Sequence, residues 1–151
     1  INISGQLKSR LKEEGYQVLT DAQKAHYVLQ TNVLQIGKMS ASASSSALGG
    51  GFGSAIAGAT AGAAVGSFTH TTSGMVTGGL SGGVIGLAAD ALVKDVSYSM
   101  ITDVQITEHK VYGDKCYRTR IVSSANQVNL KFSSAKPLLE KGLVKAISGI
   151  F

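Results

Sequence analysis

The sequence predicts an α+β fold in which a small sheet covered by helices is interrupted by a glycine-striped transmembrane α-helical hairpin. The stretch from Met39 to Ala89 contains no Asp, Glu, Lys or Arg, whereas charged residues are spread over the rest of the chain. Apolar and polar residues alternate from Val96 to Thr107, which is the pattern of a strand. Amphipathic helix patterns open and close the chain, so the order of elements indicates helices on one face of a sheet.

The uncharged stretch predicts a hairpin of two membrane-spanning helices. Leu48–Phe68 and Gly74–Lys94 are two blocks of small and apolar residues on either side of a polar tip. Each block is about twenty residues long, and a rise of 1.5 Å per residue makes roughly 30 Å, the thickness of the bilayer core. Residues 39–94 are therefore expected to form the hairpin, and residues 1–38 with 95–151 a separate α+β domain.

Small residues recur at every fourth position of both blocks, which indicates close packing of helices and oligomerisation. This stripe consists of Gly50, Ser54, Gly58, Gly62, Gly66, Gly74, Gly78, Gly82 and Gly86. Bulky residues lie mostly two positions away, about 200° around a helix, and are predicted to face lipid. They are Phe52, Ile56, Val76, Leu80, Val84 and Leu87.

The two ends of the predicted hairpin leave the membrane on the same side. Lys38, Asp90 and Lys94 are the charges that flank it, and they mark this boundary. The tip between the helices is short, polar and uncharged, which favours contact with a partner. It consists of Phe68, Thr69, His70, Thr71, Thr72 and Ser73.

Two other interpretations of the glycine-rich stretch remain open, a flexible linker and a pair of buried helices in a soluble protein. Linkers seldom carry Phe, Ile, Val and Leu in register with glycine, and a membrane favours helix despite the low propensity of glycine. A nucleotide-binding loop is disfavoured because Ile56 stands where the third glycine would be.

Composition favours an anionic lipid surface over nucleic acid as the partner. The net charge is +5, but Trp is absent, aromatic residues make up 6%, and the basic residues are dispersed. Cys116 is the only cysteine, so no disulfide can form within the chain.

The remaining elements follow from local patterns. A helix is expected over Ile3–Glu14 and ends at Gly15. Strands are expected at Tyr16–Leu19, from Tyr27 to about Ile36, over Val96–Thr107, and from Tyr117 after a turn at Tyr112–Lys115. Little structure is expected for Ser40–Ser46.

The last helix is expected to start near Ser133 and Ser134, with Pro137 in its first turn. Its predicted apolar face consists of Leu139, Leu143, Ala146, Ile147 and Ile150, while Lys141 and Lys145 point away.

No group of residues indicates catalysis, a metal site or a cofactor, so a non-enzymatic function is expected. His26, His70 and His109 lie far apart and lack metal-ligand spacing. Glu13 and Glu14 are adjacent and point to different sides of a helix, which does not suit paired acid and base chemistry.

The sequence resembles the TraT family of outer-membrane lipoproteins encoded by conjugative plasmids. Six segments carry the resemblance: Gly15–Val18, Ala88–Val93, Met100–Ile106, Thr119–Val122, Val128–Phe132 and Ala135–Pro137. The resemblance implies surface exclusion, in which redundant conjugative transfer between cells carrying related plasmids is blocked, together with complement resistance.

The resemblance also implies a homo-oligomeric ring in the bacterial outer membrane, with the α+β domain in the periplasm and the tip at the cell surface. It implies a lipid anchor on an N-terminal cysteine, which has no counterpart in this chain. The implied partners are further copies of the chain, outer-membrane lipid, and the mating apparatus or pilus of a donor cell. An oligomeric pore or channel is the alternative function that the glycine-striped ring leaves open.

Overall fold

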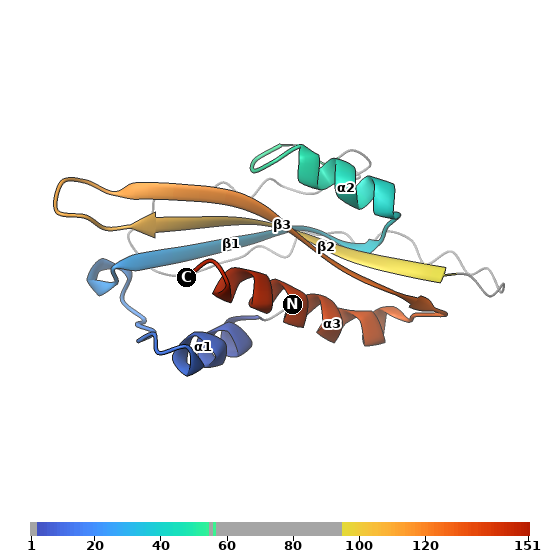
Figure 1. Cartoon of the computed structure of the whole chain (residues 1–151), viewed down its shortest axis with the longest axis horizontal. Helices are drawn as coiled ribbons and strands as arrows, with labels where there is room; N and C mark the ends of the chain where they lie inside the picture. The colour runs from blue at the N-terminus through green and yellow to red at the C-terminus, as the bar shows by residue number, and fades with distance from the viewer. Residues whose placement is uncertain (1–2, 55, 57–94) are drawn as a thin grey trace.

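The computed structural model describes residues 3–54, 56 and 95–151. Three strands form one antiparallel sheet in the order β1–β2–β3, namely β1 (Tyr27–Lys38), β2 (Asp95–Glu108) and β3 (Lys115–Val128). They are long for a small domain, and the β2–β3 turn projects beyond the helices (Figure 1). The α+β class, with helices packed on a small sheet, is confirmed.

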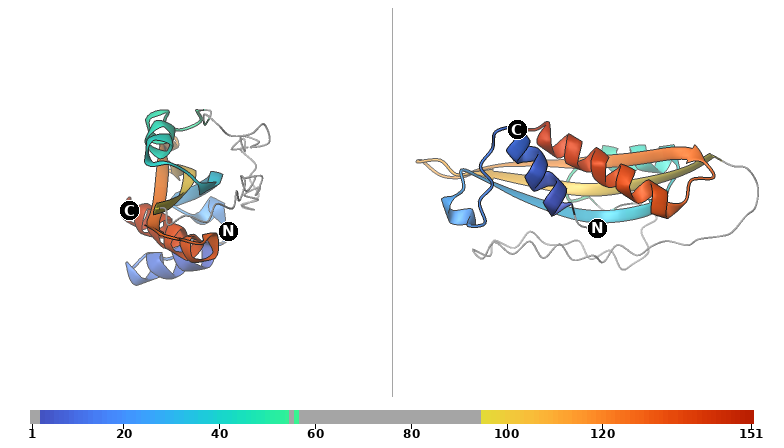
Figure 2. Two further views of the ribbon diagram at one scale, coloured as in Figure 1. Left: turned by 90° about the vertical axis from the view of Figure 1, so that its right-hand side faces the viewer. Right: turned by 90° about the horizontal axis from the view of Figure 1, so that it is seen from below.

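The helices lie on both faces of this sheet. α1 (Ser4–Glu13) and α3 (Phe132–Ser148) pack together below it, and α2 (Ala41–Gly49) lies on the opposite face (Figures 1 and 2). A short 3-10 turn, η1 (Ala22–Lys24), precedes β1. The sheet therefore separates two layers, one formed by α1 and α3 and one by α2 with residues 50–54.

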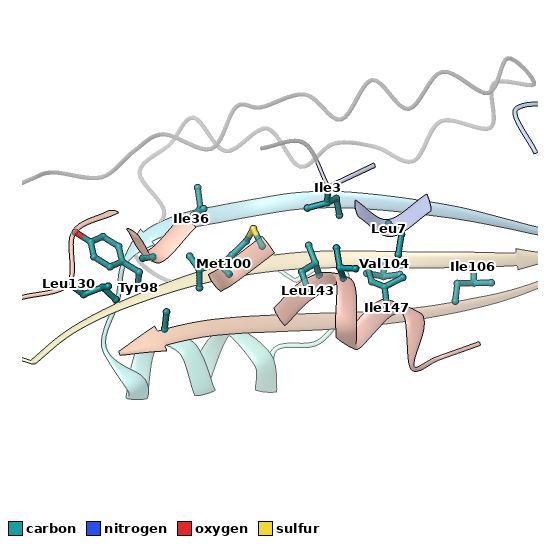
Figure 3. Close-up of a cluster of buried hydrophobic side chains, with 14 residues drawn as sticks. Ile3, Leu7, Ile36, Tyr98, Met100, Val104, Ile106, Leu130, Leu143 and Ile147 are labelled. Atoms are coloured by element: carbon teal, nitrogen blue, oxygen red, sulfur yellow. The ribbon is translucent and has the colours of Figure 1, made fainter. Parts of the chain in front are cut away.

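The central strand β2 is buried on both of its faces, because alternate side chains point into different layers. Tyr98, Met100, Val104 and Ile106 face α1 and α3, where they join Leu139, Leu143 and Ile147 in the main core (Figure 3). Ile101, which interrupts the polar row of this strand, packs on the other face with Leu34, Met39 and Ala47. The predicted strand and its alternation are confirmed.

Strand β1 confirms the predicted strand from Tyr27 and extends it to Lys38. The register against β2 shifts between Val33 and Gln35, which marks a bulge. Because a bulge changes which face the following side chains occupy, it explains why the apolar alternation of this strand is imperfect.

Helix α1 confirms the prediction, and Gly15, at φ +95°, ends it as expected. The strand predicted at Tyr16–Leu19 is wrong, since these residues have no regular structure. The Tyr16 hydroxyl instead donates a hydrogen bond of 2.6 Å to the carbonyl oxygen of Phe151, and the two rings pack edge to face. Tyr16 thus holds this segment against Phe151, which follows α3.

Helix α3 begins at Phe132, slightly earlier than predicted, so Pro137 lies in its second turn. Leu139, Leu143 and Ile147 are fully buried as expected, while the predicted core positions Ala146 and Ile150 are exposed. The buried side of the helix is completed by Ala135 and Val144. Lys141 and Lys145 point away from the core as predicted.

Residues 40–54 differ from the prediction. Ser40 caps α2 by accepting a hydrogen bond from the amide of Ala43, so Ser40–Ser46 is not irregular. The helix ends at Gly49, and the turn that follows excludes a helix running on continuously from Leu48. No helix within residues 3–54, 56 and 95–151 is long and apolar enough to cross a membrane. The second predicted block, Gly74–Lys94, lies wholly outside the described residues.

Candidate functional site

Polar side chains are concentrated on the α2 face of the sheet, where they form hydrogen-bonded rows across the strands. In one row the Gln105 side-chain amide donates to Gln30 at 3.0 Å, and Arg118 Nε donates to Gln105 at 2.9 Å. In another, Asp103 of β2 lies opposite Arg120 of β3. Because directly opposed side chains in an antiparallel pair point to the same face, the strand register alone brings these groups together.

Asp103 and Arg120 form a buried, two-pronged ion pair. Arg120 Nε lies 2.7 Å from Asp103 Oδ1, and Nη2 lies 3.1 Å from Oδ2. Their side chains are only 3% and 1% exposed. Removing two charges from water is costly, so a pair at this depth persists only where further hydrogen bonds satisfy the remaining donors and acceptors.

The last turn of α2 and the chain that follows it to residue 54 supply those hydrogen bonds. Arg120 donates to the carbonyl oxygens of Ala47 and Ser54, both at 3.0 Å, and to the Ser54 hydroxyl at 2.8 Å. The Gly53 amide donates to Asp103 Oδ2 at 2.8 Å. All five guanidinium donors are thereby used. We call these five residues, Ala47, Gly53, Ser54, Asp103 and Arg120, the Arg120 clamp.

Glycine gives this turn its shape. Gly51 and Gly53 have φ values of +71° and +75°, a region that residues with a Cβ rarely adopt. A Cβ on Gly50 would lie 2.5 Å from the Ser54 hydroxyl oxygen. The glycines therefore let the backbone fold tightly enough to present its amide and carbonyl groups to the ion pair.

A row of hydroxyl groups fastens α2 itself to the sheet. Ser44 of α2 lies 2.8 Å from Ser99 of β2, which in turn lies 2.9 Å from Ser124 of β3. Ser44 and Ser99 are buried. Serine in α2 thus has a structural role, since the Ser44 hydroxyl forms a hydrogen bond with the sheet that an apolar side chain could not form.

The arrangement is suited to anchoring and not to bond-breaking chemistry. The charges of the ion pair neutralise each other, and every donor of Arg120 is already occupied by protein groups. Over the part of the chain that the structure describes, no three His, Cys, Asp or Glu side chains gather where they could hold a metal ion. What the clamp does is fix the backbone at Ser54, which lies within the first block of the predicted hairpin.

Five of the predicted site residues lie within the described residues: Lys38, Gly50, Phe52, Ser54 and Ile56. Gly50 caps α2 and Ser54 lies just after the turn that follows it, so neither lies within a helix of the described residues. Phe52 lies with its ring centre 5.6 Å from the Arg118 guanidinium, and Ile56 packs beside the Ile101 cluster. Lys38 is exposed at the end of β1.

The other predicted site residues lie outside the described residues. They are the remaining stripe and lipid-facing positions from Gly58 to Leu87, the whole tip from Phe68 to Ser73, and the boundary residues Asp90 and Lys94. Sequence reasoning missed the Arg120 clamp. The available signal was that Asp103 and Arg120 each belong to the polar row of a strand.

A second cluster of charges lies at the end of the sheet beside the β2–β3 turn. Burial by itself would raise the pKa of Glu108, but hydrogen bonds from Lys110 and Tyr117 and the nearby positive charges of Lys110 and His26 lower this pKa below its ordinary value. The hydrogen bond and charge of Glu108 in turn raise the pKa of Lys110. Both side chains therefore keep their charges over a wide range of pH.

Comparison with known proteins identifies the family. The sequence profile described as "Enterobacterial TraT complement resistance protein" matches residues 1–115 and 109–151, which together cover the whole chain. The chain belongs to the TraT family. A TraT complement resistance protein of Escherichia coli strain K12 is 39% identical over 175 residues, covering 98% of this chain and 72% of that protein. Another from Escherichia coli is 36% identical over 98% of this chain and 71% of its own length.

Membership of the TraT family confirms the resemblance inferred from the sequence motifs. Several of those motifs form the described fold. Met100–Ile106 is the buried centre of β2 and contains Asp103, and Thr119–Val122 contains Arg120. The segments that carry the resemblance therefore include both charged residues of the Arg120 clamp.

Proposed function

We propose that this TraT protein is a non-enzymatic surface-exclusion protein of the bacterial outer membrane. It blocks redundant conjugative DNA transfer by binding, and contributes to complement resistance. The observation that carries this proposal is the family relationship, which extends over 98% of the chain to proteins named for complement resistance. In this proposal the Arg120 clamp has a structural role, because protein groups bind all of the guanidinium donors of Arg120.

In this proposal the membrane-spanning hairpin lies within residues 39–94, beyond Ser54, and the domain formed by the described residues on either side of it is periplasmic and held by an N-terminal lipid anchor. The glycine stripes join copies of the chain into a ring. The Arg120 clamp supports this arrangement physically, since it fixes the backbone at Ser54 to a rigid sheet. A segment attached in this way leaves the domain at a defined position in every copy.

The tip from Phe68 to Ser73 is the proposed contact with the mating apparatus of a donor cell. A recipient making this protein should receive a related conjugative plasmid less often than a recipient carrying an empty vector. Exchanging Thr69–Ser73 for the tip of a different TraT protein should change which donor plasmids are excluded. The measurement is the transfer frequency from each donor in matings with equal cell numbers.

In the matched control, the exposed turn residues Val111, Tyr112 and Gly113 of the described domain are exchanged for the corresponding residues of the same TraT protein. This control should leave both the strength and the specificity of exclusion unchanged. If the tip exchange also leaves the specificity unchanged while the protein reaches the outer membrane in normal amount, the tip is not the recognition element.

A further inference from the structure

Positive charge is concentrated on the face of the sheet that α1 and α3 cover. α1 with its capping residue Glu14, and α3 with its capping residue Lys131, contain seven basic and three acidic residues, a net charge of +4 out of +5 for the whole chain. The basic residues are Lys8, Arg10, Lys12, Lys131, Lys136, Lys141 and Lys145. A one-sided charge of this kind attracts anionic partners to that side.

Most of these cations have no acidic partner within the described part of the chain. Arg10 contacts Glu13 and Glu14 at 3.5 and 2.9 Å, and Lys136 lies 3.9 Å from Glu140. No such contact involves Lys8, Lys12, Lys131, Lys141 or Lys145, all of which are exposed. Their charges are therefore available to an external anion.

The exposed side of α3 combines these charges with an apolar residue. Leu138, Lys141 and Lys145 are three and four positions apart, so they share one side of the helix. Leu138 is 52% exposed although its neighbour Leu139 is completely buried. α1 lies beside α3 in the same layer and adds Lys8 and Lys12, one turn apart (Figure 2).

We infer that this basic layer, formed by the exposed sides of α1 and α3, docks on the anionic headgroups of a lipid bilayer. Lysine side chains reach phosphate groups while their methylene stems lie along apolar surface, and Leu138 on the same side of α3 enters the boundary of the acyl chains. Nucleic acid fits less well, because bases call for exposed aromatic rings. Phe132, the one aromatic residue of the two helices, is partly buried against Tyr98. The inference concerns α1 and α3 alone and does not require residues 57–94 to cross a membrane.

The test compares partition of the full chain into vesicles of phosphatidylcholine and of an equimolar mixture of phosphatidylcholine and phosphatidylglycerol. Because Met39 to Ala89 carries no charge, it contributes equally to both vesicles, and the ratio of the two partition constants reports the basic layer. The ratio is measured for the wild type, for Lys141→Gln/Lys145→Gln and for Lys24→Gln/Lys115→Gln. The last is a control with the same charge change at the far end of the sheet.

We expect the wild type to prefer anionic vesicles at low salt and to lose this preference at high salt. At about fivefold per lysine, the α3 variant should lower the ratio by roughly 25-fold, whereas the control changes it far less. Leu138→Ser should weaken binding to anionic vesicles without affecting binding to a labelled DNA duplex. Equal ratios for the α3 variant and the control would overturn the inference, as would DNA binding that depends on Lys141 and Lys145 without any preference for anionic vesicles.

Discussion

Replacing Arg120 with methionine should destabilise the described domain by about 3–5 kcal/mol, because the change leaves the Asp103 carboxylate buried without its partner. It also leaves the carbonyl oxygens of Ala47 and Ser54 without their donor. For a domain of this size, such a loss lowers the midpoint of thermal unfolding by at least about 10 °C. Circular dichroism of the detergent-extracted protein measures that midpoint.

Arg118→Met is the matched control for this prediction. Arg118 lies on the same face of the same strand, but it is exposed and, within the described part of the chain, makes only one hydrogen bond, to Gln105, beside its contact with the Phe52 ring. Its replacement should cost less than about 1 kcal/mol. The double variant Asp103→Leu/Arg120→Met should be more stable than Arg120→Met alone, since it removes the unpaired charge. Equal midpoints for Arg118→Met and Arg120→Met would contradict the role assigned to the Arg120 clamp.

Replacing Leu139 with alanine should lower the free energy of unfolding by about 3 kcal/mol. Leu139 is completely buried in the core between α3 and the sheet, so truncation removes apolar contacts and leaves a cavity. The adjacent residue provides the control, because Leu138 is 52% exposed and Leu138→Ala should cost less than about 0.5 kcal/mol. Thermal unfolding of both variants under one set of conditions measures the difference. A loss as large for Leu138→Ala would mean that α3 presents a different side to the sheet.

The sequence was most informative where one local pattern determines the structure. The alternation in β2 predicts both its extent and its two faces, because successive side chains of a strand must point in opposite directions. Gly15 marks the end of α1 because the chain there adopts a positive φ. Leu139, Leu143 and Ile147 repeat at four-residue intervals, and their burial follows directly from the helical period.

The remaining features depend on contacts between residues that are distant in the sequence. Ser40–Ser46 reads as irregular because serine favours turns, yet capping by Ser40 and the contact of Ser44 with Ser99 stabilise a helix there. Arg120 meets Ser54 across 66 positions and Ala47 across 73. No periodicity within one element indicates such a meeting. It becomes visible only when the strand register and the end of α2 are both known.

The most direct test of the proposed assembly is the mass of the detergent-extracted protein by light scattering, measured beside a Gly62→Leu/Gly82→Leu variant. If the glycine stripes join membrane hairpins into a ring, the wild type has the mass of a large, discrete oligomer. The leucine side chains should then break it into smaller species, because they prevent close approach of helix backbones. A wild type that is monomeric without detergent, and a variant of the same mass, would contradict this account of the TraT protein.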